Sequence, residues 1–158
     1  MLYQFQNYLT FENIYFWSNI ILLPFWLMII FIPHLKITKI FVNSIIIPLI
    51  LSCAYVYIIY KSFLLGENFF AESLNLYVGL NDLYTILSTE QFLLIFWLHF
   101  IALNIFLGSW VSYNSLKYNI PRTVVFVPLI LIYFSGPVGL FLYWFIRIFY
   151  AKKIGLYD

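Results

Sequence analysis

The stretch Trp97–Trp110, WLHFIALNIFLGSW, is apolar and aromatic, yet it also carries an imidazole and a carboxamide. It lies within a charge-free run, 91–116, that is long enough to cross about 30 Å of hydrocarbon as an α-helix, which needs roughly 20 residues. Charge-free runs of similar length occur at 13–33, 40–60 and 123–146. The sequence therefore predicts an all-α integral membrane protein, a four-helix bundle with spans at about 13–33, 40–60, 91–113 and 123–147.

The composition agrees with a membrane protein. Of the 158 residues, 65% are hydrophobic and 9% are charged, and the mean hydropathy is +0.97. A soluble domain is about 25% charged. Four spans use most of the chain, so we expect one membrane domain over residues 1–158. The small, dispersed net charge of +2 excludes nucleic acid as a partner, and the single Cys53 excludes an intrachain disulfide.

Two short loops are basic, HLKITK at 34–39 and KYNIPR at 117–122. With four crossings they share one side of the membrane, while both termini and the connection 62–89 share the other. Lysine and arginine then divide evenly between the two sides, so the positive-inside rule does not choose an orientation. Because all six acidic residues fall on the second side, we expect the short basic loops in the cytoplasm.

The connection 62–89 keeps many apolar residues and is predicted to lie along the membrane interface as one or two short amphipathic turns. It ends in STEQ, in which Ser88 and Gln91 have the spacing of a capping box for the third helix. Glu90 then has two interpretations. It is either a carboxylate facing the positive end of that helix, or a residue of a functional site.

Three spans contain proline, at Pro24, Pro48 and Pro137. Each proline removes a hydrogen bond to the carbonyl four residues earlier, so three bent helices are expected. Gly136 and Gly139 flank the third proline. Small residues let a neighbouring helix, or a long flat ligand, approach the backbone, and the sequence leaves both explanations open.

The third span carries polar side chains instead of proline. Asn104, Gly108 and Ser112 recur every four residues, which favours a helix contact with the carboxamide hydrogen-bonded across it. His99 is expected near the bilayer midplane, buried and facing a cavity between the bent helices, where an ionisable group usually marks a site and would be neutral. The alternative is a histidine bonded to a neighbouring hydroxyl or carbonyl. Arg147 is either a snorkelling anchor or a ligand contact. Two histidines and one cysteine make no metal set.

These positions carry a resemblance to a known family. Its elements are LPFWLM (23–28), Pro33 and ITK (37–39), then STEQFLLIFWLHF (88–100) with Phe106 and Gly108, then GPVGL (136–140) with Tyr143 and Arg147. In their order and spacing, over nearly the whole chain, they resemble the abscisic-acid-deficiency membrane proteins of plastids and bacteria, whose plant members take part in forming neoxanthin from violaxanthin. The resemblance implies a multi-pass protein of a bacterial inner membrane or a plastid-type membrane.

The resemblance also implies an activity, the isomerisation of a xanthophyll 5,6-epoxide to an allenic alcohol without a redox change or a cofactor. Such a step needs an acid at the epoxide oxygen and a base for the adjacent vinylic proton. His99 is the expected catalytic residue, because it is the midplane group able to do either. The expected ligand contacts are Trp97, Asn104, Phe106, Gly108, Trp110, Pro137, Gly139 and Arg147, with Glu90 as a further candidate.

Two positions depart from the family's pattern, which has an acid at Asn104 and an arginine at Ser109. A carboxamide keeps the hydrogen bonds of an acid but neither accepts a proton at neutral pH nor carries its charge. This difference favours an alternative function, a non-catalytic carotenoid- or quinone-binding subunit. Such a subunit would pack beside a larger membrane pigment complex, or form a homo-oligomer among the membrane lipids.

Overall fold

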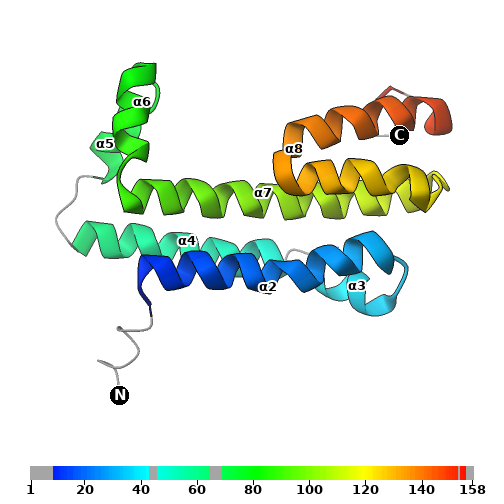
Figure 1. Ribbon diagram of the computed structural model, residues 1–158, viewed down its shortest axis with the longest axis horizontal. Helices are drawn as coiled ribbons and strands as arrows, with labels where there is room; N and C mark the ends of the chain where they lie inside the picture. The colour runs from blue at the N-terminus through cyan, green and yellow to red at the C-terminus, as the bar shows by residue number, and fades with distance from the viewer. Residues whose placement is uncertain (1–8, 43–45, 65–68, 153, 156–158) are drawn as a thin grey trace. The chain divides into compact units, whose positions relative to one another are not determined.

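The computed structural model describes residues 9–42, 46–64, 69–152 and 154–155. Every regular element in these ranges is a helix (Figure 1). In chain order the helices are α2 (Phe11–Phe31), α3 (Lys36–Phe41), α4 (Ile46–Leu64), α5 (Phe69–Asn75), α6 (Leu80–Leu87), α7 (Glu90–Lys117) and α8 (Arg122–Ala151). The predicted all-α class is confirmed.

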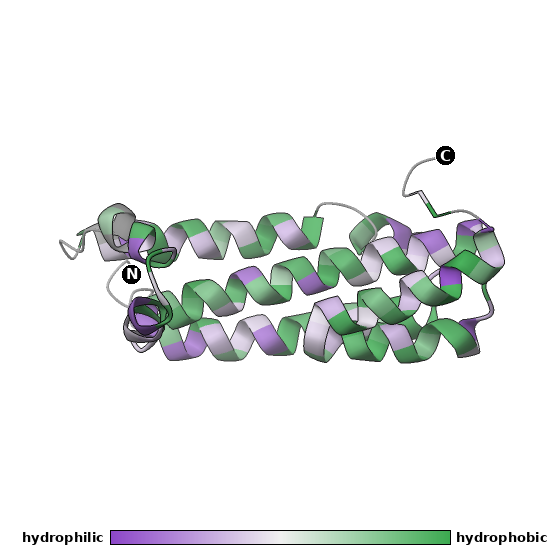
Figure 2. Ribbon diagram, turned by 90° about the horizontal axis from the view of Figure 1, so that it is seen from above, coloured by the Kyte–Doolittle hydropathy of each residue, from purple (hydrophilic) through white to green (hydrophobic). Residues whose placement is uncertain are grey.

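Within the described residues, four helical segments are long and apolar enough to cross a membrane, namely α2, the segment Lys36–Ser62 that includes α3 and most of α4, α7 and α8. Hydrophobic residues lie on every side of α2, α4 and α7, and Figure 2 shows them along the whole visible length of the long helices. A helix that is apolar all round needs apolar surroundings on all sides, which lipid supplies. Length and composition together therefore mark a membrane protein, as the sequence predicts.

The described residues group into two compact units. The first unit comprises residues 1–21 and 49–100, and so contains the start of α2, most of α4, the short helices α5 and α6, and the start of α7. The second unit comprises residues 22–48 and 101–158, and so contains the end of α2, helix α3, the first described residues of α4, the rest of α7 and all of α8.

In the first unit, the connection between α4 and α7 contains two short helices, α5 and α6, as predicted. Helix α6 turns away from the direction of α7 (Figure 1), and its Leu80 and Tyr84 are largely exposed. A location in the membrane interface remains a prediction. The predicted capping box is wrong, because Ser88 closes α6 instead, with its hydroxyl donating to the Tyr84 carbonyl at 2.8 Å. The residue that precedes α7 is Thr89, whose carbonyl accepts from the Leu93 N–H at 3.0 Å.

In the second unit, α8 reverses its direction at Ser135, whose φ of −153° and ψ of 77° are not helical. A Cβ built on Gly139 would lie 2.5 Å from the carbonyl oxygen of Pro128. In a straight helix, eleven residues separate two positions by about 16 Å. Helix α8 is therefore a hairpin of two arms, 122–134 and 136–151, which lie one above the other in Figure 1.

This hairpin differs from the single bent span that the sequence predicts. Pro137 lacks the N–H that would bind the Tyr133 carbonyl, and the freed carbonyl accepts a long hydrogen bond from Asn104 Nδ2 at 3.5 Å. Gly136 lies so close to the Asn104 side chain that a Cβ would overlap its Oδ1. The proline thus opens the helix, and the small residues let the chain fold back against its neighbours.

The other two prolines lie in α2 and α4. Pro24 lies inside α2, which is continuous from Phe11 to Phe31. Pro48 lies in α4, close to Ile46, the first residue of that helix that the structure describes. The carbonyl that it was expected to free, that of Ser44, lies outside the described residues.

Candidate functional site

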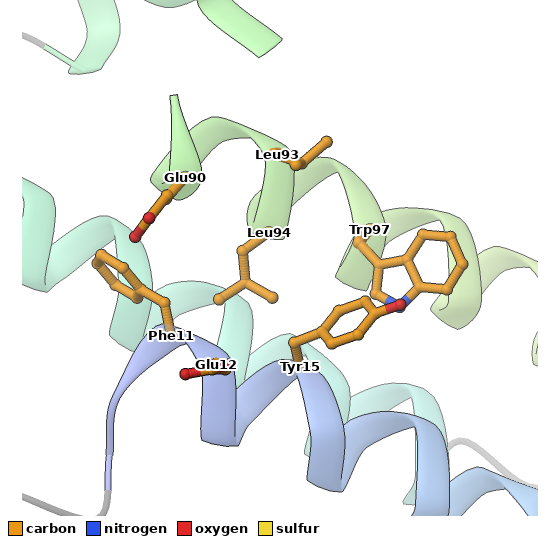
Figure 3. Close-up of a pocket in the computed structure, with 7 residues that line it drawn as sticks. All are labelled: Phe11, Glu12, Tyr15, Glu90, Leu93, Leu94 and Trp97. Carbon is orange, nitrogen blue, oxygen red and sulfur yellow. The ribbon is translucent and has the colours of Figure 1, made fainter. Parts of the chain in front are cut away.

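An open pocket of about 570 Å³ lies in the first unit, between the first turns of α2 and α7. Its lining residues are Phe11, Glu12, Tyr15, Glu90, Leu93, Leu94 and Trp97. Figure 3 shows the two carboxylates toward one end of this α2–α7 pocket and the rings of Tyr15 and Trp97 at the other. The volume falls in the range of about 300–1,000 Å³ that is typical of small-molecule sites.

The aromatic end of the pocket is held in place by the side chain of Asn19. Its Oδ1 accepts a hydrogen bond from Trp97 Nε1 at 3.2 Å, while its Nδ2 donates to the Tyr15 carbonyl at 2.7 Å. The rings of Tyr15 and Trp97 lie 5.6 Å apart between centroids, and Phe100 lies 5.5 Å from the same indole. The rings form an aromatic surface beside an apolar floor formed by the buried Leu94.

The polar end of the pocket holds two carboxylates, those of Glu12 and Glu90. Each belongs to the first turn of its helix, where unpaired N–H groups favour negative charge. Lys61, from α4, lies against the same end, with its Nζ 4.5 Å from the centroid of the Phe11 ring. Two acids, one nearby cation and an apolar wall can bind the polar end of an amphipathic molecule and can exchange protons with it.

A second polar cluster lies in the second unit and centres on Arg147. This Arg147 cluster comprises Asn114, Tyr118, Tyr143, Trp144 and Arg147. Asn114 Oδ1 accepts from Tyr143 Oη at 2.7 Å and from Arg147 Nε at 2.9 Å. Arg147 Nη2 lies 3.3 Å from Tyr118 Oη, and the guanidinium carbon lies 4.9 Å from the ring centroids of both Tyr118 and Trp144.

Arg147 is fully buried, so its interpretation as a snorkelling anchor is wrong. The hairpin brings it against the end of α7, where the Asn114 carboxamide and the Tyr118 side chain receive its donors, and the ring of Trp144, from the same arm of α8, also lies beside its charge. Sequence reasoning missed Asn114 and Tyr118. A signal was present, since Asn114 and Tyr118, like Tyr143 and Arg147, are four residues apart and therefore share a helix face.

His99 is exposed on α7 and is not among the lining residues of the α2–α7 pocket. The expectation that it is buried beside a cavity is therefore wrong. It lies in an exposed stripe of α7 with Phe96, Leu103 and Phe106, which have the three- and four-residue spacing of a single helix face. Its catalytic role remains only a prediction.

The remaining candidate residues of α7 pack helices together. Asn104, Gly108 and Ser112 are all buried, which confirms the predicted contact stripe. A Cβ on Gly108 would lie 2.7 Å from the Trp26 ring. Trp110 stacks on Trp144, with the planes 11° apart and the centroids at 6.3 Å.

On α8, Pro137 is exposed, whereas Gly139 is buried against Ile132. The structure thus brings only Glu90 and Trp97 together at the pocket, and the other predicted residues belong elsewhere. Their contacts with a ligand stay predictions: Asn104, Phe106, Gly108, Trp110, Pro137, Gly139 and Arg147. Within the described ranges, no three His, Cys, Asp or Glu side chains are grouped as a metal site would require.

The fold and these two sites define a helical membrane protein with a carboxylate-lined pocket at the first turns of α2 and α7 and a buried arginine in a helical hairpin. The chain belongs to the ABA DEFICIENT 4-like family, whose model matches residues 13–143. The matched residues include Glu90 but not Glu12, and they end before Arg147. No curated protein and no solved structure matches the chain.

Proposed function

We propose that this protein is a carotenoid-modifying isomerase that binds the ring end of a xanthophyll in the α2–α7 pocket. Membership of the ABA DEFICIENT 4-like family supports a role related to neoxanthin synthesis. The observation that carries the proposal is that two carboxylates and an aromatic pair line one pocket. A xanthophyll combines the same two features, an oxygenated ring and a long conjugated chain.

Along α7, the carboxylate end and the aromatic end of the pocket follow one another in the same order as the oxygenated ring and the conjugated chain of such a substrate. Glu90 begins the helix, and Trp97 follows about 10 Å deeper along its axis. Leu93 and Leu94 line the interval between them. An oxygenated ring beside the carboxylates would therefore direct its polyene past the leucines and across the faces of Trp97 and Tyr15.

The proposed reaction is a proton-transfer isomerisation that needs no cofactor. One of the two carboxyl groups, in its acid form, protonates the epoxide oxygen as the C–O bond on the polyene side breaks. The other, as a carboxylate, removes the vinylic proton, and the electrons of that C–H bond form the new cumulated double bond. One proton enters and one leaves, so the product is an isomer and the two carboxyl groups exchange roles.

Glu12 and Glu90 replace His99 in this proposal, because His99 is exposed and does not line the pocket. The test is expression in cells that make an epoxy-carotenoid, followed by analysis of the pigment profile. Glu90→Gln and Glu12→Gln should each lower product formation by about 100-fold, the usual size of a general acid or base effect. Full activity of both variants would overturn the assignment, and Asp82→Asn, a substitution of an exposed acid on α6, is the matched control.

Binding without turnover is the second candidate, and one observation favours it. Asn104 stands where the family's pattern has an acid, and its side chain is engaged with the Tyr133 carbonyl at 3.5 Å rather than with the pocket. Purification in mild detergent separates the two functions. Stoichiometric unmodified carotenoid or quinone with no new pigment in the cells would support binding alone.

A further inference from the structure

The two arms of α8 are too short to cross a membrane separately. At 1.5 Å per residue, arm 122–134 spans about 20 Å and arm 136–151 about 24 Å, against about 30 Å of hydrocarbon. The second arm returns to the level at which the first began, because Arg147 Nη2 lies 3.3 Å from Tyr118 Oη, just before the loop that leads into α8. Both ends of α8 therefore lie at the same end of the second unit.

Charge is divided unevenly between the two units. Seven of the eight lysine and arginine residues belong to the second unit, and only Lys61 belongs to the first. Five of the six acids belong to the first unit, and only Asp158 belongs to the second. The units therefore carry formal charges of −4 and +6, which add to the net +2 of the chain.

We infer that α8 enters and leaves the membrane at one face, so that the chain crosses three times, and that the cations at this face bind anionic lipid headgroups of the cytoplasmic leaflet. Three crossings place the segment after α8 on the same side as 34–39 and 117–122. With three crossings, the lysine and arginine residues no longer divide evenly between the two sides of the membrane, as they do with four. The positive-inside rule now assigns this face to the cytoplasm.

The cations of this face are accessible to headgroups. Their side chains are exposed and come from α3, from the end of α7 and from both ends of α8: Lys36, Lys39, Lys117, Arg122 and Lys152. Acidic lipids of the cytoplasmic leaflet attract such cations, and the attraction weakens with salt. Helix α7 has 28 residues, which is enough to cross, and a crossing puts its first residue, Glu90, on the opposite side of the membrane from Lys117. The inference that a substrate enters from that side of the membrane rests on the proposed function. The inferred number of crossings is independent of it.

Cysteine labelling of intact bacterial cells tests the topology without any pigment. In a Cys53→Ser background, single cysteines replace exposed residues: Leu35→Cys before α3, Asn81→Cys in α6 and Ile154→Cys after α8. A membrane-impermeant maleimide should label Asn81→Cys alone, and the other two only after permeabilisation. Labelling of Ile154→Cys together with Asn81→Cys would overturn the hairpin topology. Labelling of Leu35→Cys and Ile154→Cys without Asn81→Cys would overturn the orientation.

Lipid retention tests the partner. The protein is purified in detergent with a mixture of phosphatidylglycerol and phosphatidylcholine, and bound lipid is measured by native mass spectrometry. In the variant Lys36→Gln/Lys39→Gln/Lys152→Gln, the ratio of bound phosphatidylglycerol to bound phosphatidylcholine should fall by at least about threefold. In Lys61→Gln, a variant of the first unit, this ratio should not change. Equal retention of the two lipids by the unmodified protein, or an equal loss in both variants, would overturn the headgroup assignment.

Discussion

Arg147 and Asn114 are 33 positions apart in the chain, and Nε of the arginine donates to Oδ1 of the asparagine at 2.9 Å inside the second unit. The same oxygen accepts from Tyr143 Oη at 2.7 Å. One carboxamide thus joins the returning arm of α8 to the end of α7. This contact is possible only because α8 reverses at Ser135.

Replacing Asn114 should destabilise the second unit more than replacing an exposed asparagine. Asn114→Leu removes the shared acceptor and leaves the Arg147 Nε–H and the Tyr143 hydroxyl without it in a buried setting. We expect a loss of about 3 kcal/mol in the free energy of unfolding, measured by denaturation in detergent micelles. Asn81→Leu on the exposed face of α6 is the control, and an equal effect of the two variants would contradict the role of the cluster.

Gly108 should not tolerate a methyl group while Trp26 is present. A Cβ at this position would lie 2.7 Å from the Trp26 ring, so Gly108→Ala should cost about 2 kcal/mol. Trp26→Leu removes the ring atoms that the methyl group meets. In the double variant, part of the loss caused by Gly108→Ala should therefore be recovered, and a double-mutant cycle measures the coupling. Additive effects would show that the two residues do not interact.

Trp97 should determine how well a conjugated ligand is retained. Its indole is held by Asn19 and lies against Tyr15 in the wall of the pocket. Trp97→Ala should reduce xanthophyll retained after purification by about tenfold, since loss of one aromatic contact costs roughly 1.4 kcal/mol or more. Trp17→Ala, which removes an exposed tryptophan of the same unit, should leave retention unchanged. Equal losses in both variants would place the ligand elsewhere.

Removing the imidazole of His99 should have little effect on product formation. His99 is exposed on α7 and is not among the residues that line the pocket, so it has no access to a ring bound between Glu12 and Glu90. We expect His99→Ala to change the amount of product by less than about twofold, against about 100-fold for Glu90→Gln. Loss of product in His99→Ala, with Glu90→Gln active, would return the catalytic assignment to the histidine.

The candidate site shows how far side-chain chemistry can be predicted from the sequence. Asn104, Gly108 and Ser112 were correctly predicted as a contact stripe, because their four-residue spacing places them on one face of any helix. The environment of His99 was predicted wrongly. Helix α7 is apolar on every side, so its periodicity does not distinguish the buried face from the exposed one (Figure 2). Glu12 and Asn19 were missed because their importance depends on which helix lies beside them.

The sequence alone determined that this is an all-helical membrane protein with four long apolar segments, because length and apolar composition decide whether a segment is stable in hydrocarbon. It also determined where α8 would lose a backbone hydrogen bond, because proline has no N–H. Only the tertiary structure decided that the chain reverses there. A missing hydrogen bond allows the helix to bend or to reverse but does not determine which. The reversal is determined by the packing of Gly139 on Ile132 and by the hydrogen bond from Arg147 to Asn114.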